Sequence, residues 1–241
     1  MLYDFAIKSP GIFFISAVCA CLVLFFAHSA TALTTSPDRI SALEQRLIAE
    51  GFVDVRTLDD SIMVDLKYAR VDNFMGINVY GDFIRAYLRP AAAQKLVKAN
   101  EILKKRHAHL CILVADALRP RSIQHKMWEK VVTTPKQPYV ANPHTGSMHN
   151  YGGAVDVSLY NTETEELLDM GTPLDFFGPL AAPRLENQFL RAGKLNEEQI
   201  ANRLILRNAM CEAGWHQLQI EWWHFDAFPK DYIRRNYSII E

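Results

Sequence analysis

LCILVAD, at positions 110–116, is the stretch of sequence that decides the fold. Its first six residues are apolar, and Asp116 ends the run. A short segment that is continuously apolar is typical of a strand buried on both faces. The sequence therefore predicts a central strand over residues 110–115, with Asp116 at its end.

Helices and further strands are predicted on both sides of this strand. The predicted helices begin at Pro37, Pro90, Pro120 and Asn196, and the first and last end at Gly51 and Gly214. The predicted strands cover residues 52–55, 62–66, 154–160 and 217–225, and residues 161–195 are predicted to form lid-like loops. This order predicts the α+β class, as a single domain with helices packed on a mostly antiparallel sheet.

The N-terminal region has the pattern of a secretory signal peptide. Residues 11–27 carry no charge, Lys8 precedes them, and Ala30-Thr31-Ala32 offers small residues for cleavage. We expect cleavage after Ala32, which leaves residues 33–241 as one secreted or periplasmic domain. An uncleaved N-terminal anchor is the alternative, because the apolar run with its flanks approaches the length that spans a bilayer.

The composition is that of an ordinary globular protein. Of 241 residues, 49% are hydrophobic and 22% are charged, which excludes disordered, collagen-like and solenoid classes. The formal net charge is -1, and no run of Lys or Arg interleaves with aromatic residues. We therefore expect no nucleic-acid partner, and membrane contact only if the signal stays uncleaved.

Two cysteines, Cys111 and Cys211, lie in the predicted mature domain. They could form a disulfide in an oxidising compartment. Two buried thiols are the alternative, because Cys111 falls in the apolar strand and Cys211 in a predicted helix. Neither cysteine has a CxxC neighbour, so no cysteine-metal site is predicted.

The segment GSMHNYGGAVD, at residues 146–156, concentrates residue types that bind metals. His149 and Asp156 flank the pair Gly152-Gly153. The glycines permit a sharp turn, so the imidazole and the carboxylate can converge on one point. Apolar neighbours surround Asp156, and a charge in such a place requires a partner such as a metal ion.

A second segment, QIEWWHF at residues 219–225, adds a histidine and a carboxylate among large aromatic side chains. His149, Asp156 and His224 are together the kind of ligand set that a catalytic zinc ion uses, with a fourth position open to water. Glu221 is then the candidate general base, since a partly desolvated carboxylate can take a proton from that water. On a regular strand Glu221 and His224 would point to opposite faces, so a turn or bulge must separate them.

Each of these residues also has a purely structural interpretation. A single His149 is more often a surface loop residue, a single Asp156 a turn or cap residue, and Trp222-Trp223 packing alone. The convergence of HxxGGAxD with ExxH makes a metal site an equal alternative to these structural interpretations. The other histidines lack such neighbours and are interpreted as structural: His107, His109, His125, His144 and His216.

These motifs resemble those of the zinc D-alanyl-D-alanine dipeptidases, the vancomycin-resistance type and its relatives. The pattern SxHxxGxAxD at residues 147–156 is followed by EWWH at residues 221–224, as in that family. Residues 65–74, the turn from Asp116 to Pro120 and residues 170–176 are similar as well. The resemblance covers nearly the whole of the predicted mature chain.

The resemblance implies the chemistry of the central residues. It implies one zinc ion per chain, held by His149, Asp156 and His224, with Glu221 as the general base. It also implies that Arg119 stabilises the oxyanion of the tetrahedral intermediate, because a guanidinium is always charged and its donors are fixed.

Four more residues are implied by the resemblance to contact or orient the substrate. Tyr68 and Asp175 would hold the free α-amino group of a dipeptide, Ser147 would hydrogen-bond its carboxylate, and Asp116 would orient Arg119. Without the resemblance, Arg119 would be interpreted as a surface salt bridge, Tyr68 as a packed tyrosine and Asp175 as a turn residue.

Four positions depart from the pattern of the family. Ala117-Leu118 stands where the resistance-type enzymes carry Gly and a bulky aromatic residue, and Asn150-Tyr151 where they carry Ser and a basic residue. We expect these positions at the wall of the pocket. There they would alter the range of substrates and leave the zinc chemistry unchanged.

The sequence thus predicts a secreted or periplasmic zinc dipeptidase that acts on D-Ala-D-Ala and related dipeptides from cell-wall metabolism. A D,D-carboxypeptidase that trims peptidoglycan peptides is an alternative, and Tyr68 and Asp175 argue against it because capture of a free amino group closes that side of the site. A non-catalytic zinc-binding module is a further alternative. Glu221 argues against it, because a module without hydrolysis does not need a base.

Overall fold

Strand β4 (Leu110–Asp116) lies inside the larger of two sheets. The computed structural model describes residues 40–241. Every residue of β4 is buried in the interior of the protein. β4 pairs with β2 (Met63–Val64) on one side and with β5 (Ala154–Asn161) on the other. The prediction of a central buried strand that ends at Asp116 is confirmed, and the apolar run is continuous because both faces of the strand are covered.

The larger sheet has six strands, in the order β2-β4-β5-β8-β7 with β6 paired to β5. The remaining strands are β6 (Glu166–Leu167), β7 (His216–Gln217), β8 (His224–Asp226) and the separate pair β1 (Val53–Asp54) and β3 (Tyr87–Leu88). Within residues 40–241, β2 and β4 are the one parallel pair, and the other pairings are antiparallel. The predicted α+β class is confirmed, with a mixed sheet.

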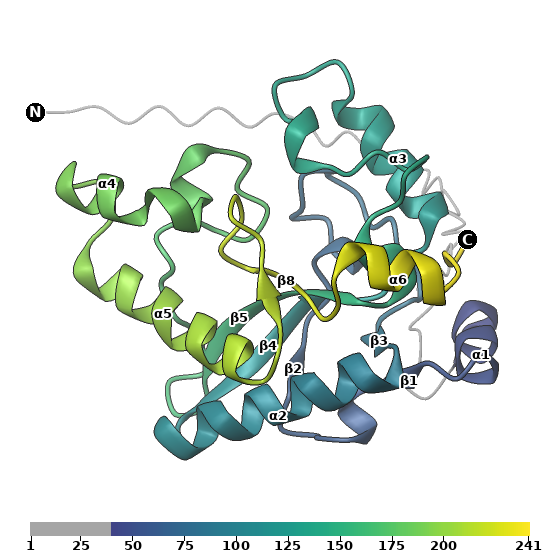
Figure 1. Ribbon diagram of the computed structural model, residues 1–241, viewed down its shortest axis with the longest axis horizontal. Coiled ribbons are helices and arrows are strands. Elements are labelled where there is room, and N and C mark those ends of the chain that lie inside the picture. The colour runs from purple at the N-terminus through teal and green to yellow at the C-terminus, as the bar shows by residue number, and fades with distance from the viewer. Residues whose placement is uncertain (1–39) are drawn as a thin grey trace, which may run out of the picture. The chain divides into compact units, whose positions relative to one another are not determined.

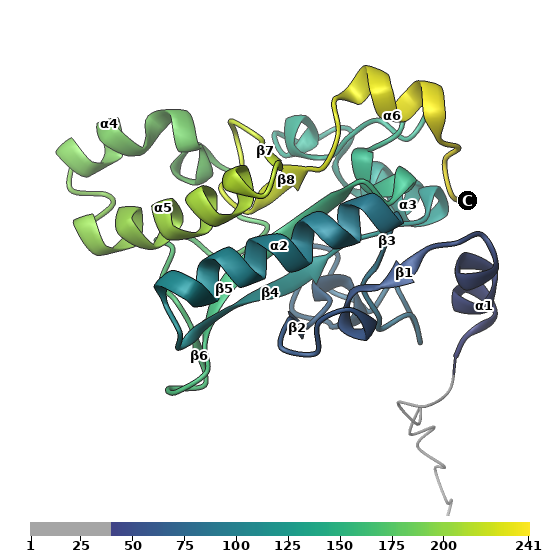
Figure 2. The same cartoon turned by 60° about the horizontal axis from the view of Figure 1, so that its bottom comes forward.

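Two long helices pack side by side on this sheet, as Figures 1 and 2 show. α2 (Pro90–Arg106) contacts β4, and α5 (Glu197–Glu212) contacts both α2 and β5. α3 (Arg121–Val131) follows β4 and α6 (Lys230–Asn236) follows β8, so both begin close to the same end of the sheet. The shorter helices are α1 (Ala42–Ala49) and α4 (Glu186–Arg191).

Most helix starts follow the sequence signals. α2 begins at Pro90, and α5 begins after Asn196, whose side chain accepts the backbone N–H of Gln199 in a capping box. α1 differs from the prediction, because it begins at Ala42 and not at Pro37. Ser41 and Glu44 form the capping box that starts it. Pro37 itself lies outside the described residues.

In the second half of the chain two predictions are wrong in detail and one helix was missed. Residues 161–195 are not loop throughout, since they contain β6 and α4. The single strand predicted over residues 217–225 is two antiparallel strands, β7 and β8, with a turn between them. The sequence analysis also missed α6. Elements this short take their conformation from the partner they pack against, and their own sequence carries little signal.

Cys111 and Cys211 are both free thiols. Cys111 is buried in β4, as one of the alternatives predicted, whereas Cys211 on α5 is exposed. The predicted signal peptide and its cleavage site lie outside the described residues. Among residues 40–241, no helix is long and apolar enough to cross a membrane.

Gly152 makes the turn from the 3-10 helix Met148–Tyr151 into β5. Its φ is +69°, a conformation that side chains rarely adopt, and a Cβ there would lie 2.5 Å from the ring of Phe52. The Arg89 guanidinium lies over the same ring at 4.1 Å from its centroid, so the ring is already packed against a second group. Close backbone approach at this turn therefore requires glycine.

We predict that Gly152→Ala lowers the free energy of unfolding by about 3 kcal/mol or more, the sum of a left-handed backbone penalty and an overpacked ring. Gly51→Ala is the matched control, because Gly51 has φ +81° and no atom within 4 Å of the added Cβ. It should lose only about 1 kcal/mol. Denaturant titration measures both, and equal losses would show that the Phe52 contact is unimportant.

Candidate metal centre and active site

The register of three neighbouring strands gathers ionisable side chains at one end of the larger sheet. Asp116 of β4 lies opposite Asp156 of β5, and Asp156 lies opposite His224 of β8. A shift in the β4–β5 register between Val114 and Asp116 occurs at this point. His149 arrives from the 3-10 helix before β5. The turn at the glycines thus brings His149 and Asp156 together, as predicted.

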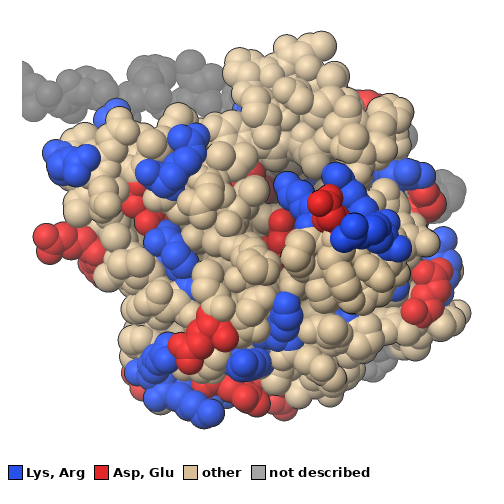
Figure 3. Space-filling model, viewed as in Figure 1, with Lys and Arg blue, Asp and Glu red and all other residues tan. Residues whose placement is uncertain are grey.

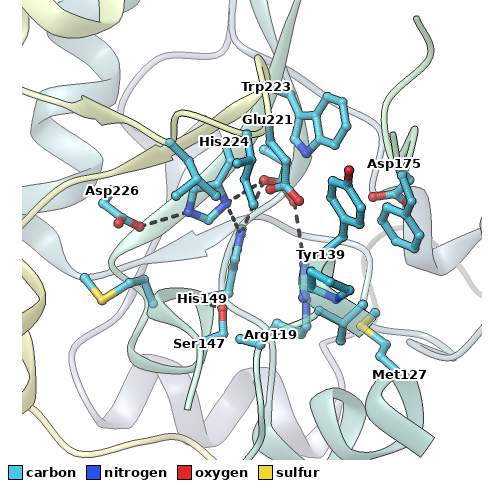
Figure 4. Close-up of a pocket in the computed structure, with 18 of the residues that line it drawn as sticks. Arg119, Met127, Tyr139, Ser147, His149, Asp175, Glu221, Trp223, His224 and Asp226 are labelled. Atoms are coloured by element: carbon cyan, nitrogen blue, oxygen red, sulfur yellow. Dashed lines mark hydrogen bonds and ion pairs between the residues drawn. The ribbon is translucent and has the colours of Figure 1, made fainter. Parts of the chain in front are cut away.

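Three ligand atoms of these side chains converge, as Figure 4 shows for the two histidines. His149 Nε2 lies 3.1 Å from His224 Nδ1 and 3.4 Å from Asp156 Oδ1. His224 Nδ1 lies 3.0 Å from the same carboxylate oxygen. All three residues are buried, with exposed fractions of 2%, 6% and 8% for His149, Asp156 and His224.

The second nitrogen of each histidine is already bonded. His149 Nδ1 donates to the carbonyl oxygen of Ala117 at 2.7 Å, and His224 Nε2 donates to Asp226 Oδ1 at 2.9 Å. These bonds select the tautomers in which His149 Nε2 and His224 Nδ1 carry lone pairs. Two lone pairs and a carboxylate oxygen therefore face one another in a buried space.

Such a cluster of acceptors is stabilised by a positive charge among them, either a proton on His224 or a metal ion. Burial alone would lower the pKa of His224, but Asp226 and Asp156 raise it well above its usual range. Donors held about 2.1 Å from a tetrahedrally coordinated zinc ion lie roughly 3.4 Å from one another. The observed separations of 3.0, 3.1 and 3.4 Å fit that requirement, so these residues could hold a divalent metal ion.

Glu221 lies in the turn between β7 and β8, three residues before His224. The turn removes the alternation of a regular strand, so Glu221 and His224 both line the same cavity. Burial raises the pKa of Glu221 to about 8, which His224 opposes and Asp156 and Asp175 reinforce. A carboxyl group with this pKa can accept and return a proton near neutral pH.

Arg119 is buried beside the ligand cluster, with an exposed fraction of 7%. Its Nε donates to Asp116 Oδ2 at 2.8 Å, and its Nη2 lies 3.6 Å from Asp156 Oδ2. Burial lowers the pKa of Arg119, but Asp116 outweighs it and holds that pKa well above the usual value. The structure therefore places a permanent positive charge on the cavity wall, where a developing oxyanion can be stabilised.

Asp175 lies at the opposite side of the cavity from His149 and His224 (Figure 4), and Tyr68 also lines the cavity. Tyr68 donates its hydroxyl to Asp175 Oδ1 at 2.9 Å, while Asp175 Oδ2 is buried and has no hydrogen-bond partner among residues 40–241. Burial, with Asp156 nearby, raises the pKa of Asp175 to about 7. The residue adopts φ +62°, unusual outside glycine. A buried carboxylate oxygen without a partner is suited to receive a cationic ligand group.

Of the remaining two predicted residues, Ser147 lines the cavity and Asp116 does not. Ser147 lines the cavity and accepts the backbone N–H of His149 at 3.3 Å, which leaves its own O–H free to donate. Asp116 does not line the cavity, because it lies behind Arg119 and also accepts the Tyr80 hydroxyl at 2.5 Å. It is therefore a partner of Arg119 and makes no contact with the space where a substrate would bind.

The cavity itself has a volume of about 230 Å³. One wall is aromatic: Phe177 stacks on Tyr139 at 5.5 Å between ring centroids and contacts Phe74 at 4.9 Å. These three rings come from three different loops, and together with Trp223 they line the cavity. In Figure 3 the hollow shows acidic side chains within it.

The expectation that the departures from the family pattern lie at the pocket wall is wrong. Ala117, Leu118, Asn150 and Tyr151 are all buried and none lines the cavity. Asn150 is fully buried, where its amide donates to the carbonyl oxygen of Arg119 at 2.8 Å and its side-chain oxygen accepts Ser147 N–H at 2.7 Å. These four positions therefore lie behind the site, where Asn150 joins the segment of Arg119 to the segment of Ser147.

Sequence reasoning missed three residues at the site. Asp226, the partner of His224 Nε2, follows it by two residues on β8, and the period-two alternation of a strand is the signal that could have found it. Lys230 and Arg234 of α6 also line the cavity. No sequence signal identifies these two residues, because only the packing of α6 brings them to the cavity.

Comparison with known proteins identifies the class of protein. A family model described as D-ala-D-ala dipeptidase matches residues 48–240. The chain belongs to this family, and it is a peptidase.

Curated members of the family are similar along most of their length. D-alanyl-D-alanine dipeptidase of Escherichia coli (strain K12) is 29% identical over 181 residues, which cover 72% of this chain and 83% of the relative. The proteins of the same name from Enterococcus faecium and Enterococcus faecalis are each 27% identical, over 76% of this chain and 96% and 94% of the relatives.

We predict that Asp226→Asn weakens binding of a divalent metal ion by roughly 10- to 100-fold, because an uncharged amide fixes the His224 tautomer less firmly than a carboxylate and makes the imidazole a weaker ligand. Titration with Zn²⁺ against a chromophoric chelator measures the affinity. Asp231→Asn is the control, since Asp231 is an exposed acid on α6 that does not line the cavity. If both variants bind equally well, the bond from His224 to Asp226 does not support the metal.

Proposed function

We propose that this protein is a zinc-dependent dipeptidase that hydrolyses D-Ala-D-Ala and related dipeptides of cell-wall metabolism. The observation that carries the proposal is the cluster of His149 Nε2, Asp156 Oδ1 and His224 Nδ1 beside the buried carboxyl group of Glu221. Family membership supports dipeptide hydrolysis. A location outside the cytoplasm rests on the N-terminal sequence pattern alone.

His149, Asp156 and His224 would hold one zinc ion per chain. When bound by two imidazoles and a carboxylate, zinc lowers the pKa of a water molecule and polarises a carbonyl oxygen. The remaining steps of the reaction belong to the side chains around it.

Glu221 accepts a proton from the water that attacks the peptide carbonyl carbon. The C–O bond forms as the carbonyl electrons move onto oxygen, and Glu221 then returns the proton to the nitrogen of the leaving amine as the C–N bond breaks. Two free amino acids are released. The pKa of Glu221 at about 8 supports both transfers, because the group is poised to gain and lose a proton near neutral pH.

Arg119 stabilises the negative charge that develops on the carbonyl oxygen. Its hydrogen bonds to Asp116 and Gln124, with N–O distances of 2.8 and 2.9 Å, hold the guanidinium in place before the substrate arrives. A charged donor already held in position requires little reorganisation when the charge appears.

Asp175 and Tyr68 bind the free α-amino group of the substrate, and Ser147 hydrogen-bonds its carboxylate. The unpartnered Asp175 Oδ2 supports this assignment, because an ammonium group would supply the missing donor. This arrangement favours a dipeptidase over a D,D-carboxypeptidase, whose peptide substrates extend beyond that position. The buried Glu221 argues against a non-catalytic zinc module.

We predict that Glu221→Gln retains about one zinc ion per chain while turnover of D-Ala-D-Ala falls by a factor on the order of 10²–10⁴, because the amide cannot accept a proton. His149→Ala is the contrasting variant, and it should lose zinc because only two protein ligands remain. Elemental analysis and product assays measure both effects. Turnover near that of the parent in Glu221→Gln would remove Glu221 from the mechanism.

We also predict that D-Ala-D-Ala is hydrolysed roughly 10- to 100-fold faster than its N-acetyl derivative, because the blocked peptide leaves Asp175 buried without a cationic partner. Asp175→Ala should narrow the difference by slowing hydrolysis of the free dipeptide far more than that of the blocked one. Chromatography of the products measures the rates. Equal rates on both substrates in the parent protein would favour the carboxypeptidase alternative.

A further inference from the structure

Two basic side chains line the cavity and have no intramolecular partner. Lys230 and Arg234 both lie on α6, one helical turn apart. Among residues 40–241, neither side chain makes a hydrogen bond, an ion pair or a contact with an aromatic face. Figure 3 shows basic side chains gathered over α6 beside the hollow of the site.

Packing of α6 directs these two side chains toward the cavity. Ile233 is fully buried and packs with Met148, Tyr151 and Ala154, next to the helix that carries His149. Residues 230 and 234 flank Ile233 along α6, and both are exposed. The apolar contact thus holds the helix against the site, and the two cations lie at the rim of the cavity.

Lys230 and Arg234 lie on the side of the cavity where the second residue of the dipeptide would bind. Asp175 and Asp226 lie on opposite sides of the two histidines in Figure 4. α6 begins four residues after Asp226, so the pair belongs to the side remote from Asp175. With the substrate amino group at Asp175 and its peptide bond at the ligand cluster, the second residue of the dipeptide extends toward α6.

The nearby acids do not neutralise the pair. Asp226 accepts the Nε2–H of His224 and is only 9% exposed. Asp231, the acid of α6, does not line the cavity. Two positive charges are therefore available to an anionic group in this part of the cavity.

We propose that Lys230 and Arg234 bind a carboxylate on the second residue of the substrate and so determine which dipeptides are used. The inference rests on the proposed function. The carboxylate is either the C-terminal α-carboxylate, which Ser147 alone would leave without a counter-charge, or a carboxylate of an acidic side chain. Ammonium and guanidinium groups bind carboxylates through charge-assisted hydrogen bonds, and Arg can do so through two donors at once.

The experiment compares the parent with the double variant Lys230→Met/Arg234→Met. Methionine preserves an unbranched side chain and helix propensity while it removes the charge. Arg235→Met is the matched control, because Arg235 is exposed on the same helix and does not line the cavity. The substrates are D-Ala-D-Ala, D-Ala-D-alaninamide and D-Ala-D-glutamate, and kcat and KM are measured for each.

We expect the double variant to lose on the order of 10- to 100-fold in kcat/KM on D-Ala-D-Ala, mainly through KM, with a change below twofold on the amide. Arg235→Met should resemble the parent on every substrate. In the parent, added salt should raise KM for the free dipeptide more than for the amide, because exposed charges are screened. A loss restricted to D-Ala-D-glutamate would assign the pair to the acidic side chain.

Two other outcomes separate the role of Lys230 and Arg234 from the proposed function. If the parent hydrolyses the dipeptides and the double variant matches Arg235→Met on all of them, the role of Lys230 and Arg234 is overturned and the proposed function stands. If the parent hydrolyses no dipeptide, the proposed function fails, and the inference that rests on it fails as well.

Discussion

The hydrogen-bond register of β4, β5 and β8 carries the site, because it sets Asp116, Asp156 and His224 in one row across the sheet. Side chains directly opposite in antiparallel strands have Cβ atoms about 5 Å apart, close enough for the contacts seen here. A slip of one residue would turn Asp156 to the other face. Val155 and Val157 prevent such a slip, since both are fully buried in the core and a slip would exchange them with the carboxylate.

That row creates a problem of buried charge, which Arg119 resolves. Asp116 and Asp156 are both buried, and the guanidinium lies within ion-pair distance of each. Two buried carboxylates without a cation would be strongly unfavourable, since a charge removed from water needs a partner of opposite sign. Arg119 thus contributes to the stability of the sheet end as well as to the cavity wall. The side-chain amide of Asn150 holds Arg119 in this place, because it donates a hydrogen bond to the backbone carbonyl oxygen of Arg119.

Two hydrogen bonds between distant segments hold the loop that carries Asp175. Arg203 of α5 donates to the carbonyl oxygen of Met170 at 2.7 Å, which holds the start of the loop that carries Asp175. Trp222 Nε1 donates to Thr172 Oγ1 at 2.8 Å, which joins this loop to the turn that carries Glu221. Asp175, in its strained conformation, is therefore held by the packing around it, and its position relative to Glu221 depends on contacts between distant segments.

Local signals in the sequence determined the central strand at residues 110–116, the capped helix after Asn196 and the two short motifs that carry the ligands, because each depends on neighbours a few positions apart. The register of β5 and β8 then brought the two motifs together. Tertiary structure alone decided that Glu221 lies in a turn and so lines the cavity with His224, and that Asn150 lies behind the site and not at its wall. It also decided that Lys230 and Arg234 line the cavity. The direction of a side chain on a short element is set by what that element packs against. For α6 the contact is made by its own Ile233, which packs on Met148, Tyr151 and Ala154, about eighty residues earlier in the chain.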